Sequence, residues 1–209
     1  MTSPIRIGLI GMGTVGTGVV RVLQDSAEHI SRQAGRAVLV DHVVVQDPSK
    51  QRSIELPGDQ ISNDFAQVRD NPDISIVALL LGGLEPARTL AIELLKSGKD
   101  LVTANKALLA EHGPELFGVA HEMGRSIAFE AAVAGGIPIV SAISECLTGN
   151  RISSIRGILN GTSNFILTKM EQDGTDYNEV LTLAQSEGYA EADPTMDVDG
   201  TDATQKLAL

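Results

Sequence analysis

The stretch IRIGLIGMGTVG, residues 5–16, decides how this chain folds, because a mostly apolar run that predicts a short buried strand leads directly into a glycine-rich turn. The glycines are spaced G-x-G-x-x-G, and the apolar residues after them recur at helical spacing. In this motif the first glycine permits a tight turn, the second lets a pyrophosphate approach the backbone, and the third lets helix and strand pack closely. The residues predicted to bind a dinucleotide here are Gly11, Gly13, Thr14, Val15 and Gly16. The alternative is a glycine turn that only packs.

Apolar strands alternate with helices as far as residue 130. The further predicted strands are residues 38–45, 74–81, 100–103 and 126–130. The predicted helices are residues 15–30, 64–69, 86–96, 106–112 and 114–123. Such alternation is typical of βαβ units. Residues 1–130 are therefore predicted to form a dinucleotide-binding domain of the α/β class, a Rossmann-type doubly wound parallel sheet.

The character of the chain changes after residue 130. A stretch rich in glycine and proline, residues 135–138, interrupts the alternation. The elements predicted beyond it are a strand at residues 152–159 and helices at residues 162–171 and 177–186. We therefore place a domain boundary near residue 130, with a second domain over residues 131–209.

Composition and charge argue against two classes of partner. The chain has 209 residues, of which 43% are hydrophobic and 21% charged, as is ordinary for a globular protein. Its net charge of -11 argues against nucleic acid as a partner. The longest apolar run, residues 76–81, is far shorter than the ~20 residues that span a bilayer, and the N-terminus does not resemble a signal peptide. We therefore expect no membrane partner.

Cysteine usage predicts the compartment. Cys146 is the only cysteine, so an intrachain disulfide is excluded, and a reducing, cytoplasmic compartment is expected. Cys146 lies in the apolar run IVSAISECL, residues 139–147. We therefore expect a buried structural thiol there rather than a nucleophile.

The run GYAEADPTMDVDGTDATQK, residues 188–206, places five carboxylates around one cation, Lys206. Unpaired carboxylates at this density repel one another unless a ligand, an ion or solvent relieves the repulsion. Asp202 and Lys206 are four residues apart and would share a helix face, so the pair is a candidate for orienting a substrate and transferring its proton. Two simpler interpretations are a surface ion pair, and an N-cap at Asp199 with Asp202 completing a weak capping box.

The acidic residue expected about 20 residues after the glycine-rich turn is displaced to Asp47. A carboxylate at this position would accept a hydrogen bond from a ribose hydroxyl and disfavour a 2′-phosphate, whereas Lys50 and Arg52 could hold that phosphate. The sequence therefore leaves both NAD and NADP open as the cofactor. A simple turn at Asp47-Pro48 is the alternative.

Three further positions have more than one interpretation. Lys106 stands at a predicted helix start, where the helix dipole disfavours a cation unless an anionic or polar ligand lies nearby. The tripeptide Asn160-Gly161-Thr162 is a turn with Thr162 as a helix N-cap, or part of a substrate pocket, or both. Glu130 follows an apolar strand and is a pocket carboxylate, a cation ligand or an exposed loop residue.

Four segments together resemble the homoserine dehydrogenase family. They are LVTANK at residues 101–106, EAAVAGGIP at 130–138, GILNGTSNF at 157–165 and the acidic run at 188–206. The resemblance extends from Ile5 to Leu209 and implies an NAD(P)-dependent oxidoreductase acting on a CH–OH group. Its reaction would interconvert L-homoserine and L-aspartate 4-semialdehyde in threonine and methionine biosynthesis. The resemblance also implies a small-molecule substrate, a homodimer, and a second, α+β domain that binds substrate and dimerises.

The resemblance implies roles for individual residues. Lys206 resembles the acid/base residue, and Lys106 resembles a catalytic lysine near the nicotinamide and the reacting hydroxyl. The implied substrate-binding residues are Glu191, Asp202, Thr162 and Tyr189. The predicted cofactor-binding residues beyond the glycine-rich turn are Asp47, Lys50, Gly82, Thr103, Lys106 and Gly188. A monovalent cation site, for Na⁺, is implied at Glu130 and the carbonyls of Val133, Gly135 and Ile137.

Members of this family continue well beyond the position of Leu209. The resemblance therefore implies an N-terminal portion, with an incomplete substrate domain and no regulatory domain. Two alternatives remain beside the main interpretation. One is a truncated, non-catalytic module that binds a dinucleotide and dimerises, and the other is a related dehydrogenase for another small amino acid.

Overall fold

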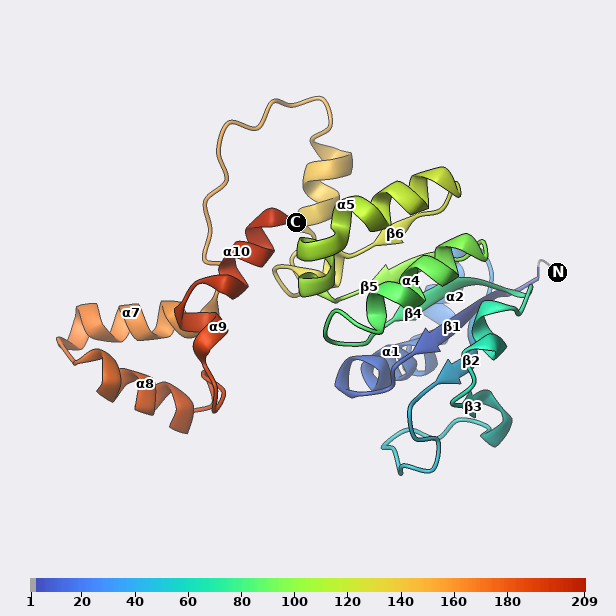
Figure 1. The fold of residues 1–209 in the computed structure, drawn as a ribbon, viewed down its shortest axis with the longest axis horizontal. Helices are drawn as coiled ribbons and strands as arrows, with labels where there is room; N and C mark the ends of the chain where they lie inside the picture. Colours follow the sequence, from blue (N-terminus) through green and yellow to red (C-terminus); the bar gives the residue numbers. More distant parts are fainter. Residues whose placement is uncertain (1–2) are drawn as a thin grey trace. The chain divides into compact units, whose positions relative to one another are not determined.

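The computed structural model describes residues 3–209 and separates into two compact units between Ala132 and Val133. Each unit is described by itself (Figure 1). The elements of the first unit are β1 (Ile5–Ile10), α1 (Thr14–Asp25), α2 (Ala27–Ala34), β2 (Val38–Val44), η1 (Gly58–Gln60), β3 (Ile61–Ser62), α3 (Ala66–Arg69), β4 (Ile74–Leu79), α4 (Ala87–Lys96), β5 (Asp100–Thr103), α5 (Lys106–Glu122), β6 (Ile127–Ala128) and η2 (Glu130–Ala132).

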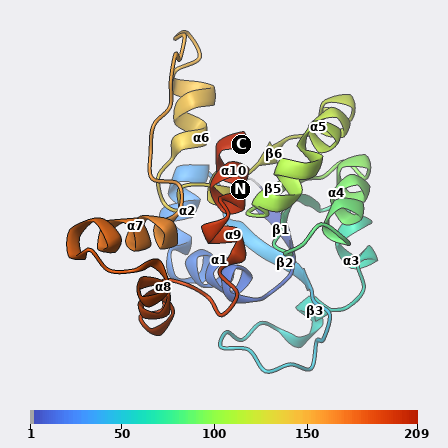
Figure 2. The same cartoon turned by 60° about the vertical axis from the view of Figure 1, so that its left-hand side comes forward.

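The first unit is built on a six-stranded sheet with the strand order β3-β2-β1-β4-β5-β6. All five neighbouring pairs are parallel. Figure 2 shows α1 and α2 on one side of the strands and α4 and α5 on the other. The prediction of a doubly wound parallel sheet is therefore confirmed. The strand order reverses between β1 and β4, where folds of this kind form a crevice at the carboxyl ends of the strands.

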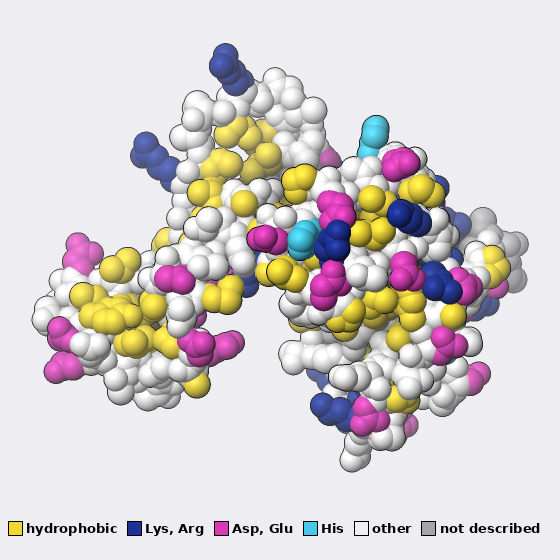
Figure 3. All heavy atoms as spheres, in the orientation of Figure 1, with side chains coloured by type: hydrophobic (Ala, Val, Ile, Leu, Met, Phe, Trp, Pro, Cys, Tyr) yellow, Lys and Arg dark blue, Asp and Glu magenta, His cyan; other side chains and the backbone are white. Residues whose placement is uncertain are grey.

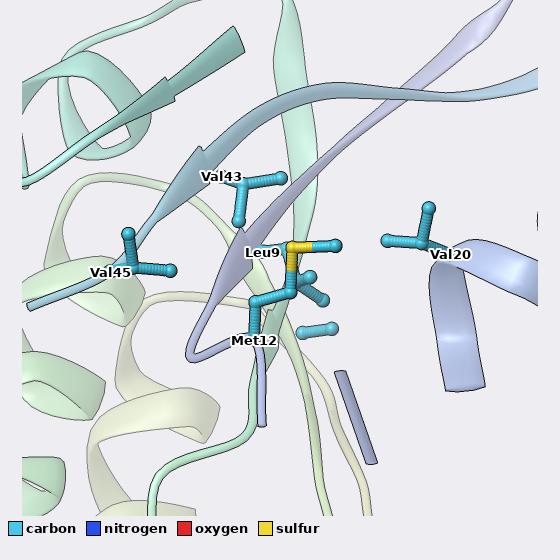
Figure 4. Close-up of a cluster of buried hydrophobic side chains, with 6 residues drawn as sticks. Leu9, Met12, Val20, Val43 and Val45 are labelled. Carbon is cyan, nitrogen blue, oxygen red and sulfur yellow. The ribbon is translucent and has the colours of Figure 1, made fainter. Parts of the chain in front are cut away.

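The core beside this crevice is aliphatic. One cluster joins Leu9 of β1, Val20 of α1 and Val43 of β2, together with Met12 from the glycine-rich turn. Figure 4 shows the Met12 side chain directed among the valines and the leucine. Met12 is only 8% exposed, so the turn is anchored by a buried side chain between its first two glycines. Full burial of a side chain of this size contributes about 1.5–3 kcal/mol.

Two helix predictions for the first unit are wrong in detail. The helix expected over residues 15–30 is divided at Ser26, which leaves helical geometry at φ -111° and serves as the end of α1 and the start of α2. The helices expected on either side of Pro114 form one continuous helix, α5. A proline inside a helix removes one backbone hydrogen bond, and its ring crowds the carbonyl four residues earlier, at a cost of about 3 kcal/mol. Buried side chains before and after Pro114, including Leu109 and Leu116, keep the helix packed through that position.

The regular elements of the second unit are all helices in the residues that the structure describes. Its elements are α6 (Ile139–Ser141), the π-helical η3 (Ala142–Cys146), α7 (Gly161–Asp173), α8 (Tyr177–Ser186), α9 (Thr195–Val198) and α10 (Thr201–Ala208). Helices α7 and α8 pack together around a small core of Ile166, Val180, Ala184 and Ala190. Figure 3 shows apolar side chains on the surface of this helix pair, bordered by acidic ones.

The strand expected at residues 152–159 is absent from the described structure. This segment runs as an open arc between η3 and α7 (Figure 1), with Ile152, Ile155 and Ile158 exposed by 42%, 56% and 73%. A strand requires a neighbour to pair with its backbone N–H and C=O groups. Between residues 133 and 209 the structure assigns no other segment to a strand, so this pairing is missing.

Cys146 is exposed, so the expectation of a buried thiol is wrong. The apolar run that contains it forms α6 and η3, whose residues are half-buried or exposed. An apolar stretch predicts burial only where another element covers it. Across residues 3–209, helices with the length and hydrophobicity needed to traverse a lipid bilayer are absent.

Candidate dinucleotide and acid–base sites

The glycine-rich turn has a distinct steric requirement at each of its glycines. Gly11 has a φ of +91°, and a Cβ there would lie 2.7 Å from the carbonyl oxygen of Leu80. A Cβ at Gly16 would lie 2.2 Å from the carbonyl oxygen of Gly11. Around Gly13, in contrast, a Cβ would meet no described atom within 4 Å. The outer glycines therefore hold the turn closed, and the middle one leaves its backbone open to a ligand.

A cleft of about 780 Å³ lies at the carboxyl ends of β1, β2 and β4. This volume is within the range of sites that bind small molecules and cofactors. The predicted cofactor residues that line it are Gly11, Gly13, Asp47, Lys50 and Gly82. Gly13 is also the N-cap of α1, so the positive end of the helix dipole lies at the cleft. This arrangement suits a pyrophosphate.

The other predicted residues of the first unit lie around this cleft in different ways. Thr14 and Val15 form the exposed first turn of α1, and Gly16 is buried beneath it. Thr103 is 3% exposed, and its hydroxyl donates to the carbonyl of Leu79 at 2.9 Å. Thr103 therefore connects the end of β5 to the end of β4 and fixes the position of these two strand ends.

The loop after β2 is organised by Asp47 and Arg52. The carboxylate of Asp47 accepts hydrogen bonds from the hydroxyl of Ser49 at 2.6 Å and from its N–H at 2.9 Å. These bonds lower the pKa of Asp47, so its exposed carboxylate is ionised at neutral pH. The guanidinium of Arg52 donates to the carbonyls of Asp47 at 2.8 Å and Lys50 at 2.7 Å. Asp47 therefore forms the expected turn and also faces the cleft, while Arg52 holds the loop.

Asn105, which was not among the predicted site residues, joins the loop after β4 to the start of α5. Its side-chain nitrogen donates to the carbonyls of Leu81 at 3.0 Å and Gly83 at 2.6 Å, in the loop after β4. Its side-chain oxygen caps α5 by accepting from the N–H of Leu108 at 3.0 Å. Lys106 follows directly as the half-buried first residue of α5. The signal that could have identified Asn105 is an asparagine immediately before a helix start.

The second unit contains a cluster around Asp202, which is only 6% exposed. Its Oδ2 accepts from Nζ of Lys206 at 2.5 Å and from Nδ2 of Asn160 at 2.9 Å. Nζ of Lys206 also donates to the carbonyl of Leu159 at 2.8 Å. The interpretation of this pair as a surface ion pair is therefore wrong. We call Leu159, Asn160, Asp197, Asp202 and Lys206 the acid–base cluster.

The polar residues next to this cluster connect α7 to the acidic run. Asn160, and not Thr162, is the N-cap of α7, and its oxygen accepts from the N–H of Ser163 at 2.7 Å. Thr162 is buried and donates to the carbonyl of Tyr189 at 2.6 Å. The N-cap of α10 is Gly200 rather than Asp199, which corrects the capping-box interpretation.

Several predicted residues of the acidic run lie away from the buried pair. Glu191 is exposed, and the ring of Tyr189 stacks on Phe165 with 4.4 Å between the centroids. Gly188 has a φ of +80° and follows the end of α8. Of these three residues, Glu191 therefore presents an exposed polar side chain, whereas Tyr189 is held against α7.

The residues predicted for a cation site stand in the sequence on both sides of the division between Ala132 and Val133. Glu130 is half-buried in η2, so the interpretation as an exposed loop residue is wrong. Val133, Gly135 and Ile137 follow at the start of the second unit, and the carbonyl of Ile137 accepts from the N–H of Ile139 at 2.8 Å. Gly135 has a φ of +58°. Groups of three or more His, Cys, Asp or Glu side chains arranged for a metal are absent from the described residues.

The fold and the cleft define a protein of the α/β class with the strand order and glycine-rich turn of dinucleotide-binding domains. Residues 11–130 match the family model described as homoserine dehydrogenase, NAD binding domain, and residues 138–209 match the model described as homoserine dehydrogenase. The chain therefore belongs to the homoserine dehydrogenase family.

Individual relatives agree with this assignment. The chain is 48% identical to the homoserine dehydrogenase of Synechocystis sp. over 98% of its own length and 47% of the relative's. The solved homoserine dehydrogenase of Thiobacillus denitrificans superimposes with a TM-score of 0.89 at 49% identity, covering 98% of this chain and 47% of that one. A hyperthermophilic archaeal homoserine dehydrogenase, solved in complex with NADPH, has a TM-score of 0.81 at 25% identity, covering 99% and 68%. The chain spans about half the length of the curated relatives it matches.

Proposed function

We propose that this chain carries the dinucleotide site and the acid–base residues of a homoserine dehydrogenase. The reaction is the interconversion of L-homoserine and L-aspartate 4-semialdehyde with NAD or NADP, in the threonine and methionine branch of amino-acid biosynthesis. The single observation that carries the proposal is the pair of buried Asp202 and half-buried Lys206 in a chain of this family. The glycine-rich cleft supports the use of a dinucleotide, and the NADPH complex of a relative agrees with it.

The glycine-rich turn fits the pyrophosphate of such a cofactor. Open space around Gly13 admits phosphate oxygens to the backbone, and the N-terminus of α1 favours their charge. When bound, the nicotinamide supplies the hydride or accepts it. The exposed carboxylate of Asp47 would accept from a ribose hydroxyl, and the ammonium group of Lys50 lies along the same cleft. These two residues would decide between NAD and NADP.

Lys206 is the proposed acid/base residue. Oxidation of an alcohol requires a base for the hydroxyl proton, and reduction of an aldehyde requires the matching acid. In the reducing direction, Nζ of Lys206 would donate a proton to the oxygen that becomes the hydroxyl of homoserine. Asp202, 2.5 Å away, holds the ammonium group in place. Lys106 at the start of α5 is the second proposed catalytic lysine.

The remaining assignments complete the proposal. The exposed carboxylate of Glu191 suits the amino group of the substrate, with Asp202, Thr162 and Tyr189 as further substrate contacts. Gly82, Thr103 and Gly188 would line or position the cofactor. A Na⁺ site at Glu130 and the carbonyls of Val133, Gly135 and Ile137 belongs to the same proposal. So do a homodimer, for which the exposed isoleucines of residues 152–158 are the support, and a cytoplasmic location, which suits a single cysteine.

The test is turnover of both substrates with both dinucleotides. We expect reduction of L-aspartate 4-semialdehyde and oxidation of L-homoserine by the parent chain. Lys206→Met should lose at least about 100-fold in kcat, since a positioned acid/base group contributes roughly 10²–10⁴-fold. Lys169→Met removes a lysine of α7 that pairs with Asp173 on the surface and should leave kcat unchanged. Normal turnover by Lys206→Met would contradict the assignment, and turnover of another amino acid instead of homoserine would replace the substrate.

A further inference from the structure

Asn160 uses the two ends of its side chain for different purposes. Its oxygen caps α7 through the N–H of Ser163 at 2.7 Å. Its nitrogen donates to the carboxylates of Asp202 at 2.9 Å and Asp197 at 2.7 Å. The residue is 8% exposed, so these contacts are shielded from water. One planar amide therefore fixes the start of a helix relative to two carboxylates from other elements, α9 and α10.

The buried carboxylate of Asp202 depends on these donors. An ionised carboxylate away from water is costly unless hydrogen bonds and opposite charge compensate it. Both Lys206 and Asn160 donate to the same oxygen, Oδ2. The neutral donor adds no charge to the pair, but it restricts the rotation of the carboxylate. Asn160 thereby fixes the direction from which Asp202 meets Lys206.

The lysine is held by the same short stretch of backbone. Its Nζ donates to the carbonyl of Leu159, the residue directly before Asn160, at 2.8 Å. Residues 159 and 160 therefore hold both members of the pair, across sequence separations of 47 and 42 residues. A shift at this junction would move the ammonium group and the carboxylate together. Because misplacement of a reacting group by about 1 Å can cost 10²-fold in rate, this junction is a sensitive point for catalysis.

We propose that Asn160 is a positioning residue for the reaction, which orients Asp202 through its amide nitrogen and thereby places Nζ of Lys206 for proton transfer. The inference rests on the proposed function, because it assumes Lys206 as the acid/base residue. It goes beyond helix capping: any good N-cap residue would stabilise α7, but a serine or an aspartate could not supply the amide donor.

The experiment compares two variants, Asn160→Ser and Asn160→Asp, which keep a side-chain oxygen for the cap and lose the amide N–H groups that reach Asp202 and Asp197. Asp176 caps α8 in the same unit through the N–H of Asn178 at 2.9 Å, so Asp176→Ser is the matched control. Rates are expressed per dinucleotide-binding site, so that unfolded protein does not count. We expect kcat to fall about 10–100-fold in both Asn160 variants with the KM for the dinucleotide unchanged, and no change in the control.

A second readout does not require turnover. Nuclear magnetic resonance of ¹⁵N-labelled lysine side chains should show a slowly exchanging ammonium signal for Lys206 in the parent chain. This signal should broaden or disappear in both Asn160 variants and persist in Asp176→Ser. Absence of homoserine turnover in the parent chain would reject the proposed function and leave this readout intact. Unchanged kcat per site together with an unchanged Lys206 signal, in either Asn160 variant, would overturn the positioning role.

Discussion

The cleft of the first unit is formed mainly by backbone, whereas the acid–base cluster of the second unit is formed mainly by side chains. The cleft uses backbone: two glycines that tolerate no Cβ, a third that is open to a ligand, and a helix N-terminus. The cluster uses side chains, brought to α7 from α9 and α10 across 37 to 47 residues of sequence. A backbone site is thus defined by a short local pattern, whereas a side-chain site exists only after distant elements have packed.

The two regions also differ in what supports them. The cleft lies on a parallel sheet with buried strands β1 and β4 at its centre. The cluster rests on a helix pair whose core contains few large side chains. We therefore expect added atoms at the glycine-rich turn to abolish dinucleotide binding by the cleft. In the cluster, we expect removal of a single polar partner to lower the free energy of unfolding.

The largest effect is expected from adding a methyl group to the turn. The Cβ of Gly16→Ala would lie 2.2 Å from the carbonyl oxygen of Gly11, and overpacking of this kind costs about 1–3 kcal/mol. Dinucleotide binding should be lost with it, as measured by calorimetry. Gly18→Ala, in the same helix with no described atom within 4 Å of its Cβ, should be neutral or stabilising by up to about 1 kcal/mol. Equal behaviour of the two variants would remove the steric account of the turn.

The next largest effect is expected in the free energy of unfolding. It is tested by comparing two lysine–aspartate pairs of the second unit that have the same i, i+4 spacing. Asp202→Ala removes one acceptor each from Lys206 and Asn160, which keep only the carbonyl of Leu159 and the carboxylate of Asp197, and this loss should reduce the free energy of unfolding by about 1–3 kcal/mol. Asp173→Ala breaks the exposed pair with Lys169, worth less than about 0.5 kcal/mol. Urea unfolding followed by circular dichroism measures both. Similar losses would show that burial does not distinguish the pairs.

The smallest effect concerns the choice of dinucleotide. Asp47→Asn removes a negative charge from the cleft, so the affinity for NADPH should rise a few-fold relative to that for NADH. Glu55→Gln, an exposed change of the same kind in the same loop, is the control. Hydrogen bonds from Ser49 lower the pKa of Asp47, so its charge is present above the ordinary value of 3.8 and is lost only as the pH falls through the lowered folded pKa. The change in the affinity ratio that Asp47→Asn causes should therefore not depend on the charge state of Asp47 through neutral pH. A ratio that Asp47→Asn leaves unchanged would exclude this residue as the determinant.

The same contrast explains what could be predicted from the sequence. The glycine spacing and the apolar runs predicted β1, the turn and α1, because each depends on neighbours in the sequence. The parallel sheet was predicted from the alternation of strands and helices, which is typical of βαβ units. The contact of Asn160 with Asp202 could not be predicted, because it crosses 42 residues and depends on the packing of α9 against both α7 and α10. The strand expected at residues 152–159 failed for a related reason. Its apolar residues match a strand, but pairing depends on a partner that the described residues of the second unit do not supply.

Tertiary packing, rather than the local sequence pattern, determined the division of α1 from α2 and the continuity of α5. Ser26 ends one helix and begins the next, although the apolar spacing continues through it. Pro114 stays inside α5, because buried leucines on both sides hold the helix against α4. In both places the local sequence preference, helical spacing through Ser26 and helix breaking at Pro114, was overridden by contacts that exist only in the folded unit.

The most direct test of the account follows one atom from the dinucleotide to the product. L-aspartate 4-semialdehyde is reduced with NADH or NADPH that carries deuterium at the transferable position of C4, and homoserine is analysed by mass spectrometry. We expect deuterium-labelled homoserine from the parent chain and its formation at least about 100-fold more slowly by Lys206→Met, although that variant should still bind the dinucleotide through the cleft of the first unit. Unlabelled homoserine, or labelled product formed by Lys206→Met at the parent rate, would contradict the account.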